Sequence, residues 1–329
     1  MNARRTGRLV IGVTIAAFFV WLMLRQINGA DLVRALQGAR IDFLALALVA
    51  FAAGYSCRIA RWRLMLARDN PRLRWGDCAG PLLASFAVNN VLPFRAGDVL
   101  RAFAFNARLG VGTGAVLATL LAERLFDLLM VLVLLVAAIG VFGLGVHRLV
   151  GVGSGAIILA ALAILGVLLW PRMFAPAARL VTGLVARINP DTGRRLGAVV
   201  EGGLHTLGNL AGSATMSRLV AWSVAAWFAE GCVFWLTALA LPTLGAPLAA
   251  WLALPVATLA TLIPSTPGYV GTFDYFTVQA MAMMGNPVAD AAAYAILVHL
   301  VLWLPPTLAG GAYLLLRPIG TGVSRENAS

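Results

Sequence analysis

Three charged residues lie close together at the start of a long apolar stretch, where an ion is costly unless it is paired or used. Glu123 and Asp127 are four residues apart, so a helix would place both carboxylates on one face. Arg124 precedes Asp127 by three residues and can pair with it. Two interpretations stay open. These groups bind a polar ligand or carry a proton, or they form an internal ion pair that locks helix packing.

Glu230 is a fourth charged group of this kind. It lies at the centre of the apolar run 219–241, without a basic residue nearby in the sequence. We expect a neutral carboxyl bonded to a backbone carbonyl, a proton-carrying group, or the ion-pair partner of Arg95 or Arg101. His299 lies in another apolar run, and we interpret it as a packing residue outside the predicted site.

Polar residues also gather where an apolar helical pattern is first broken. Around Pro93 and Gly97 the sequence places Asn89, Asn90, Arg95, Asp98 and Arg101. A broken helix exposes backbone N–H groups, which together with guanidinium forks suit a phosphate oxyanion. We therefore predict that Arg95 and Arg101 bind an anionic headgroup. Anchoring to the membrane surface is the alternative for Arg101.

A second break interrupts an uncharged run later in the chain. Its residues are Pro264, Ser265, Thr266, Pro267, Gly268, Tyr269, Gly271, Thr272 and Asp274. The prolines open the hydrogen-bond ladder of a helix, and the glycines allow close approach of the backbone. We predict a tight turn here that brings Asp274 into a wet cavity shared with Arg95, Asp98 or Arg124.

The composition identifies the class of protein that must position these residues. The chain has 329 residues, of which 61% are hydrophobic and 12% charged, and its mean hydropathy is +0.89. A soluble domain could not hide so much apolar surface, and a disordered or nucleic-acid-binding chain needs charge-rich polar stretches. The net charge of +12 comes from 25 arginines that lie beside apolar runs, as anchoring in a membrane requires. Long continuous apolar runs favour helices over a barrel, so we predict an all-α polytopic membrane protein.

Six full spans satisfy the pattern of apolar runs. They cover residues 9–24, 43–66, 128–146 (with a backward extension to Thr113), 149–171, 219–241 and 291–316. Arg58, Arg61 and Arg63 fall in the last turns of the second span, where long side chains can reach the lipid headgroups. The arginine distribution places both termini, the 68–75 loop and the segment 172–218 in the cytoplasm.

The stretches 76–106 and 247–285 contain the two breaks and do not fit as simple spans. Broken backbone survives at membrane depth only where it is buried in protein or lines a wet cavity. We predict two re-entrant helical hairpins that enter from opposite sides, one in each half of a single domain (about 1–145 and about 149–317), as an inverted repeat. Two ordinary kinked helices are the alternative. The connector, about 172–216, is predicted to lie as amphipathic helix on the cytoplasmic membrane surface.

The sequence lacks the motifs of common enzymes and metal sites. It has no Walker loop, no metalloprotease helix, no nucleophile elbow and no His/Cys set with metal-ligand spacing. Cys57, Cys78 and Cys232 are interpreted as small hydrophobic residues. We therefore expect no metal, no cofactor and no enzymatic activity.

Four motifs occur in a definite order along the chain. They are Arg58-Ile-Ala-Arg61-Trp62, Asn89-Asn90-x-x-Pro93-x-Arg95-x-Gly97-Asp98-x-x-Arg101, Glu123-Arg124-x-x-Asp127 and Pro264-x-x-Pro267-Gly268-x-x-Gly271-x-x-Asp274. In this order they resemble the transmembrane, flippase-like domain of the lysylphosphatidylglycerol synthases (the multiple peptide resistance factor family). The family often has glutamate at the positions of Asp98 and Asp274, so the charge is kept with a shorter reach. The aminoacyl-transfer domain of the full synthases is not in this sequence, and lysyl transfer is not expected.

The resemblance implies a function in lipid movement, with the motif residues as the substrate site. An anionic or lipid-linked amphipathic lipid would move between the leaflets of a bacterial inner membrane, its headgroup held in a polar cavity between the hairpins. The implied partners are an anionic phospholipid, a lipid-linked glycan or a hopanoid-type lipid, with no nucleic acid. A homo-oligomer or a biosynthetic-enzyme partner is compatible with this. Two other interpretations stay open: an integral-membrane transferase acting on a polyprenyl- or phospholipid-linked substrate, and a non-transporting protein that presents lipid to a biosynthetic enzyme.

Overall fold

A computed structural model describes Trp21 and residues 29–92, 95–143, 154–210, 214–263 and 266–317. Its elements are α2 (Gly29–Gln37), α3 (Ile41–Leu66), α4 (Trp75–Val91), α5 (Ala96–Ala104), α6 (Asn106–Leu109), α7 (Thr113–Phe142), α9 (Ser154–Leu169), α10 (Pro171–Ile188), α11 (Pro190–Leu210), α12 (Ala214–Leu239), the 3-10 turn η1 (Pro247–Ala249), α13 (Ala250–Ala260), the 3-10 turn η2 (Pro267–Tyr269), α14 (Thr272–Met283) and α15 (Val288–Leu316). The described residues contain helices and turns but no strand, as the composition predicts.

Four of the described helices are long and apolar enough to cross a membrane: α3, α7, α12 and α15. They coincide with four of the six expected spans, and α7 begins at Thr113, as the backward extension predicts. The described part of the expected span 149–171 is α9, which has 16 residues, or about 24 Å at about 1.5 Å per residue. That is shorter than a hydrocarbon core of about 30 Å. The first expected span, 9–24, lies outside the described residues apart from Trp21, so the count of six stays a prediction.

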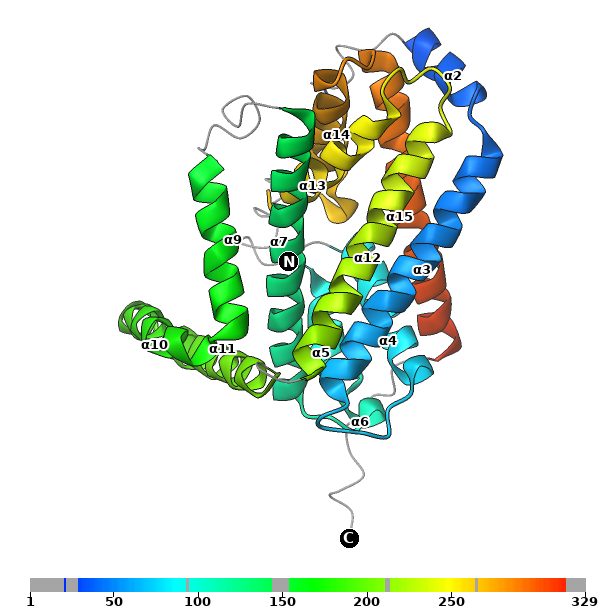
Figure 1. The fold of residues 1–329 in the computed structure, drawn as a ribbon. Helices are drawn as coiled ribbons and strands as arrows, with labels where there is room; N and C mark the ends of the chain where they lie inside the picture. The colour runs from blue at the N-terminus through cyan, green and yellow to red at the C-terminus, as the bar shows by residue number, and fades with distance from the viewer. Residues whose placement is uncertain are drawn as a thin grey trace.

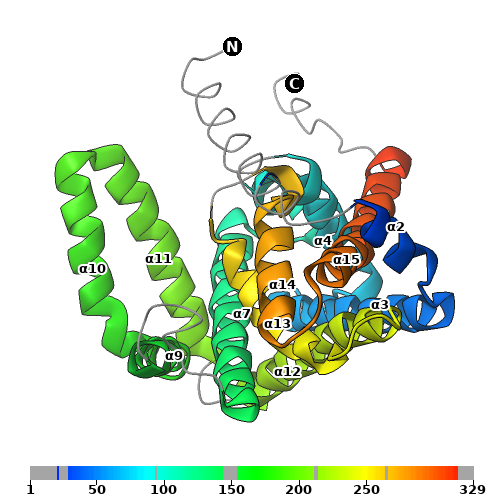
Figure 2. The same ribbon diagram turned by 90° about the horizontal axis from the view of Figure 1, so that it is seen from above.

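The long helices form a bundle with two distinct ends (Figure 1). Helices α3 and α12 lie side by side, and α15 packs against α4 and α14. The loop 67–74 and α6 lie at the lower end of Figure 1, and α2 lies at the upper end. The pair α10–α11 lies across the lower end and projects sideways from the bundle (Figures 1 and 2). The loop and the connector that were expected on one side of the membrane therefore do share one end.

Helices α10 and α11 are antiparallel neighbours with an amphipathic pattern. Leu180 and Val181 are strongly exposed, and Arg179 forms an exposed ion pair with Glu201 across the two helices at 3.4 Å. An apolar surface exposed beside arginines at the end of a bundle is what an interfacial helix presents to lipid. The placement on a membrane surface stays a prediction.

Both broken stretches fold as helix, break and helix. Helix α4 is followed by an extended Leu92 and by α5, which packs back against α4. Helix α13 is followed by η2 and by α14, which packs against α13. In Figure 1 the first pair occupies the lower end and the second the upper end. The two helices of each pair therefore pack against each other across their break, while re-entry into a membrane and the inverted repeat stay predictions.

The buried core is divided into two parts. One large cluster joins α12, α13, α14 and the first half of α15, and another joins the end of α3 to α4, α5 and the first half of α7. Between them, α3, α7, α12 and α15 each contribute a polar side chain to one cavity: Arg58, Asp127, Glu230 and His299. The fold therefore places a polar layer at the middle of the bundle, with an apolar core on either side.

Candidate functional site

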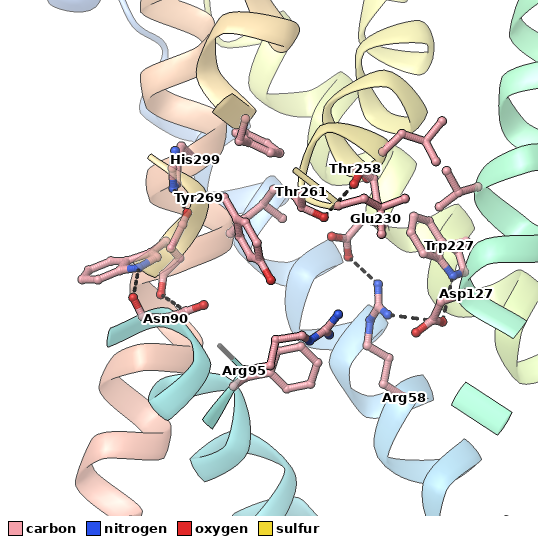
Figure 3. Close-up of a pocket in the computed structure, with 18 of the residues that line it drawn as sticks. Arg58, Asn90, Arg95, Asp127, Trp227, Glu230, Thr258, Thr261, Tyr269 and His299 are labelled. Carbon is pink, nitrogen blue, oxygen red and sulfur yellow. Dashed lines mark hydrogen bonds and ion pairs between the residues drawn. The ribbon is translucent and has the colours of Figure 1, made fainter. Parts of the chain in front are cut away.

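A cavity of about 490 Å³ occupies the polar layer (Figure 3). Its wall is formed by Tyr55, Arg58, Phe86, Asn90, Arg95, Arg124, Asp127, Leu128, Val131, Trp227, Glu230, Phe234, Thr258, Leu259, Thr261, Leu262, Gly268, Tyr269, Phe273, His299, Leu302 and Trp303. Both breaks contribute, Asn90 and Arg95 from the first and the segments 261–262 and 268–269 from the second. The two breaks, which proline and glycine mark in the sequence, thus meet at one site.

Each break holds one side chain on the cavity wall by an unusual backbone conformation. Arg95 (φ 53°) and Tyr269 (φ 60°) are the two non-glycine residues with positive φ in the described part of the chain. Residues with a Cβ seldom adopt this region, and where they do the surrounding structure must hold them there. Such strain is typical of functional segments, and here it aims a guanidinium and a phenol at the same space.

The first break is held by side-chain amides at the end of α4. The Asn89 Oδ1 accepts a hydrogen bond from the Gly97 N–H at 2.8 Å, and the Asn90 amide donates to the Thr307 hydroxyl of α15 at 2.8 Å. A Cβ on Gly97 would lie 1.8 Å from the Ser85 carbonyl oxygen. Only glycine therefore lets α5 approach α4 closely enough to place Arg95 over the cavity.

The second break touches the first through a glycine. Gly268 has φ +70°, and a Cβ there would lie 2.8 Å from the Trp303 indole nitrogen and 3.3 Å from the Asn90 carbonyl oxygen. Gly271 has φ +90° and donates its N–H to the Asp274 carboxylate at 2.9 Å, which starts α14. Pro267 opens η2. The glycines thus serve both the turn itself and its contact with the other hairpin.

An ion-pair network on and behind the cavity wall joins three helices. The Asp127 carboxylate accepts hydrogen bonds from Arg61 at 2.8 Å and from the Trp227 indole at 3.2 Å. Arg58 lies between two acids, 3.2 Å from Glu230 and 3.8 Å from Asp127. Helix α3 therefore supplies the cations, and α7 and α12 the carboxylates.

Two expectations about these residues are wrong. Arg58 and Arg61 do not extend to the membrane surface, because their side chains are only 12% and 2% exposed and bind carboxylates inside the bundle. Glu230 pairs with Arg58 and not with Arg95 or Arg101. An arginine on a span finds a buried acid more favourable than the headgroups when the acid lies on the neighbouring helix.

A second group of charges lies around Asp98. Its carboxylate is 3.2 Å from Arg95, 3.5 Å from Arg124 and 3.1 Å from the Asn89 amide. Arg124 reaches Asp127 only at 4.0 Å, so the local pair expected from their spacing is weak. Arg95 and Arg124 are the most exposed members of this network, at 43% and 35%.

The cavity has an excess of positive charge. On the wall itself, three arginines (Arg58, Arg95 and Arg124) face two carboxylates (Asp127 and Glu230), and behind it the ion pairs add one arginine (Arg61) and one carboxylate (Asp98). The excess charge lies on the two exposed guanidiniums, whereas the carboxylates are 16–20% exposed. Such an arrangement suits an anionic group that binds Arg95 and Arg124 from the cavity side.

Other predicted site residues lie away from the cavity wall. Arg101 and Glu123 form a buried ion pair inside the lower core, with 1% and 6% of their side chains exposed. Asp274 is 9% exposed and faces His299 instead of water, so the wet environment expected for it is wrong. The structure brings Arg58, Asn90, Arg95, Arg124, Asp127, Glu230 and Gly268 to the wall, and leaves Arg61, Asn89, Asp98, Arg101, Glu123, Pro267, Gly271 and Asp274 behind it.

Sequence reasoning missed His299. This residue lines the cavity and forms two hydrogen bonds with the second break, to Asp274 at 2.7 Å and to the Gly268 carbonyl oxygen at 3.0 Å. The rule that singled out Glu230, an ionisable group inside an apolar span, applies to His299 equally. Aromatic residues of the wall such as Trp303 carry no comparable signal in the sequence. Within the described residues, no group of three or more His, Cys, Asp or Glu is arranged to hold a metal ion.

Two comparisons with known proteins bear on this site. The family model described as the lysylphosphatidylglycerol synthase transmembrane region matches residues 9–310. A protein of Haloferax volcanii named glycosyltransferase AglD is 29% identical over 326 residues, which cover 90% of this chain and 52% of that protein. The chain thus spans about half the length of the curated relative it matches. Together the two matches indicate a membrane protein with a lipid-related function.

Proposed function

The chain belongs to the family of the lysylphosphatidylglycerol synthase transmembrane region, and from this premise we propose that it moves an anionic amphipathic lipid between the two leaflets of a bacterial inner membrane. The headgroup phosphate binds Arg95 and Arg124 in the cavity between the two breaks, while the acyl or polyprenyl chains stay in the bilayer. Both termini face the cytoplasm, with the lower end of Figure 1 on that side.

The observation that carries the proposal is the meeting of the two breaks at a cationic cavity. A lipid that crosses a bilayer must take a charged headgroup through hydrocarbon, at a cost of at least about 2.5–3.5 kcal/mol per charge. A cavity at mid-height of the bundle, lined by exposed guanidiniums, replaces water and counter-ions at the point where that cost is highest. The two re-entrant hairpins, one from each side, give the headgroup a polar surface on both approaches.

The wall also suits a headgroup larger than a bare phosphate. Its aromatic side chains include Tyr55, Trp227, Tyr269 and Trp303, and Asn90, Thr258 and Thr261 add hydrogen-bonding groups. Glycerol or sugar hydroxyls can bond to such groups while their apolar faces pack against the rings. This supports the substrate class of phospholipid or lipid-linked glycan without choosing between them.

Reconstitution tests the proposal. The purified protein is placed in vesicles with fluorescent phosphatidylglycerol, cardiolipin or a polyprenyl phosphate, and an impermeant quencher reports lipid that reaches the outer leaflet. We expect faster exposure of at least one anionic lipid than in protein-free vesicles. Arg95→Ala and Arg124→Ala should slow it, while the exposed Arg187→Ala, on the connector helix α10, should not.

Each alternative gives a different result in the same experiment. A covalently altered lipid found by mass spectrometry would favour a transferase, the class to which the name of the Haloferax volcanii relative belongs. If the protein is folded but the lipid is neither moved nor altered, the remaining interpretation is a protein that presents lipid to a biosynthetic enzyme. Equal rates for the wild type and for Arg95→Ala would contradict the assigned binding site.

A further inference from the structure

His299 and Asp274 form a hydrogen-bonded pair that the proposed function does not yet use. The His299 Nδ1 lies 2.7 Å from the Asp274 Oδ1, and the His299 Nε2 lies 3.0 Å from the Gly268 carbonyl oxygen. The second carboxylate oxygen of Asp274 accepts the Gly271 N–H at 2.9 Å. Both ring nitrogens of His299 therefore face oxygen atoms at hydrogen-bond distance.

The number of protons in this arrangement follows from the chemistry of the partners. A backbone carbonyl oxygen and an ionised carboxylate can only accept hydrogen bonds, and a neutral imidazole carries one N–H. A neutral His299 beside an ionised Asp274 would leave one bare ring nitrogen against an oxygen lone pair. The side chains are only 15% and 9% exposed, so water is a poor substitute there. The geometry is satisfied by one additional proton, carried as imidazolium with carboxylate or as imidazole with carboxylic acid.

This proton would hold the second break in shape. The Gly268 carbonyl and the Gly271 N–H flank Tyr269, whose φ of 60° is uncommon for a residue with a Cβ. Removing the proton removes one of the hydrogen bonds that fix the segment, so that Tyr269 is held only by the bonds of its N–H to the Thr266 carbonyl and of its carbonyl to the Thr272 hydroxyl. Because Tyr269 and Gly268 both line the cavity, protonation of the pair is linked to the shape of the binding site.

The charged neighbours of the pair are engaged elsewhere. The other charged or titratable side chains of the cavity wall are Tyr55, Arg58, Arg95, Arg124, Asp127, Glu230 and Tyr269. Within the described residues, the arginines of the wall pair with Asp98, Asp127 and Glu230 and not with Asp274. On the other elements around His299, the Phe273 ring packs edge-on to the imidazole at 5.1 Å, and Thr258, Phe234 and Asn90 face the cavity without charge. The proton therefore belongs to the pair itself.

We propose that His299 and Asp274 form a proton-binding site built into the second break, which holds one proton in the conformation seen here and releases it when the break opens during transport. The proton is then a coupling ion for lipid movement. The coupling rests on the proposed function, whereas the proton site rests on the hydrogen-bond geometry alone.

Magnetic resonance of the histidine ring tests the site without any transport assay. The sequence has three histidines, so His147→Gln/His205→Gln leaves His299 as the single ¹⁵N-labelled ring in a lipid nanodisc. At neutral pH we expect N–H signals from both ring nitrogens, or an infrared carboxylic-acid band that Asp274→Asn abolishes. Asp290→Asn, a control at another acid near the start of α15, should change neither. A neutral ring with one bare nitrogen, and no band that depends on Asp274, would overturn the proposal.

A double variant tests the coupling. In His299→Gln/Asp274→Asn the two amides can make the same hydrogen bonds to Gly268 and Gly271 without a titrating proton. We expect wild-type lipid movement to change severalfold over the pH range in which the ring signal converts, and movement by the double variant to stay constant. A wild-type rate that is constant over that range would refute the coupling. Vesicles in which no variant moves lipid would refute the proposed function, with the ring spectrum still deciding the proton site.

Discussion

Breaking the buried pair of Arg101 and Glu123 should unfold the protein more easily without affecting lipid binding. The two side chains are 1% and 6% exposed, and the guanidinium donates to both carboxylate oxygens. It also lies 4.7 Å from the centre of the Trp62 ring. The pair joins α5 to α7 inside the lower core, away from the cavity wall.

The expected magnitude follows from what each substitution leaves behind. Glu123→Leu leaves a buried guanidinium without its counter-ion, and Arg101→Met leaves a buried carboxylate. Removal of one partner of such a pair costs about 3–5 kcal/mol, whereas replacing both by apolar residues of similar volume is often neutral. At about 1.36 kcal/mol per decade, each single variant should shift the unfolding equilibrium by roughly two to nearly four decades. The double variant Arg101→Met/Glu123→Leu should recover most of that loss.

The free energy of unfolding is measured at equilibrium in mixed micelles with increasing dodecyl sulfate. For the double variant, the rate of lipid movement per folded protein is then measured in vesicles. We expect strong non-additivity of the unfolding free energies and a wild-type rate of lipid movement. Losses below about 1 kcal/mol for the single variants, as in exposed pairs, would contradict the buried geometry. A stable double variant that moves no lipid would indicate that Arg101 does bind the headgroup.

Three further outcomes are expected. Gly268→Ala adds a Cβ against the Trp303 indole at a left-handed position, and the left-handed backbone alone costs about 1–2 kcal/mol. This variant should insert into the membrane but should not move lipid. The control variant Gly140→Ala, at a glycine with open space around it, should still move lipid. Arg95→Lys should slow movement of an anionic lipid, because an ammonium lacks the planar fork of a guanidinium. An unchanged rate would show that Arg95 does not bind the headgroup in a bidentate manner. In right-side-out vesicles, an impermeant thiol reagent should label a cysteine at position 38 and not one at position 191; the reverse pattern would invert the topology.

Much of the fold could be predicted because single residues report it. A continuous apolar run needs no partner to be recognised, and α3, α7, α12 and α15 coincide with the runs. Proline and glycine likewise disrupt the backbone locally, so both breaks were visible before any contact between them was known. Their common cavity could be expected from the cost of open backbone in hydrocarbon.

The ion-pair partners could not be predicted, because they depend on how distant helices are rotated. Arg58 and Glu230 are 172 residues apart in the sequence, and spacing arguments reach only three or four residues along a helix. Arg61 was placed at the membrane surface for the same reason, since a helix that is apolar on every side does not reveal which face is inside. His299 was missed by a judgement about residue type, although its place in an apolar span gave it the same signal as Glu230.

Reversible blocking of the cavity tests the central claim most directly. In a variant with Cys57, Cys78 and Cys232 replaced by alanine, a single cysteine is placed at Thr261 on the cavity wall or, as a control, at Leu248, which is 56% exposed outside it. Each protein is labelled with a bulky methanethiosulfonate reagent, and movement of an anionic lipid is measured in vesicles before labelling, after labelling and after reduction. We predict that the label at position 261 stops lipid movement, that reduction restores it, and that the label at position 248 has no effect. Undiminished movement by protein fully labelled at position 261 would show that the headgroup does not pass through the cavity between the two breaks.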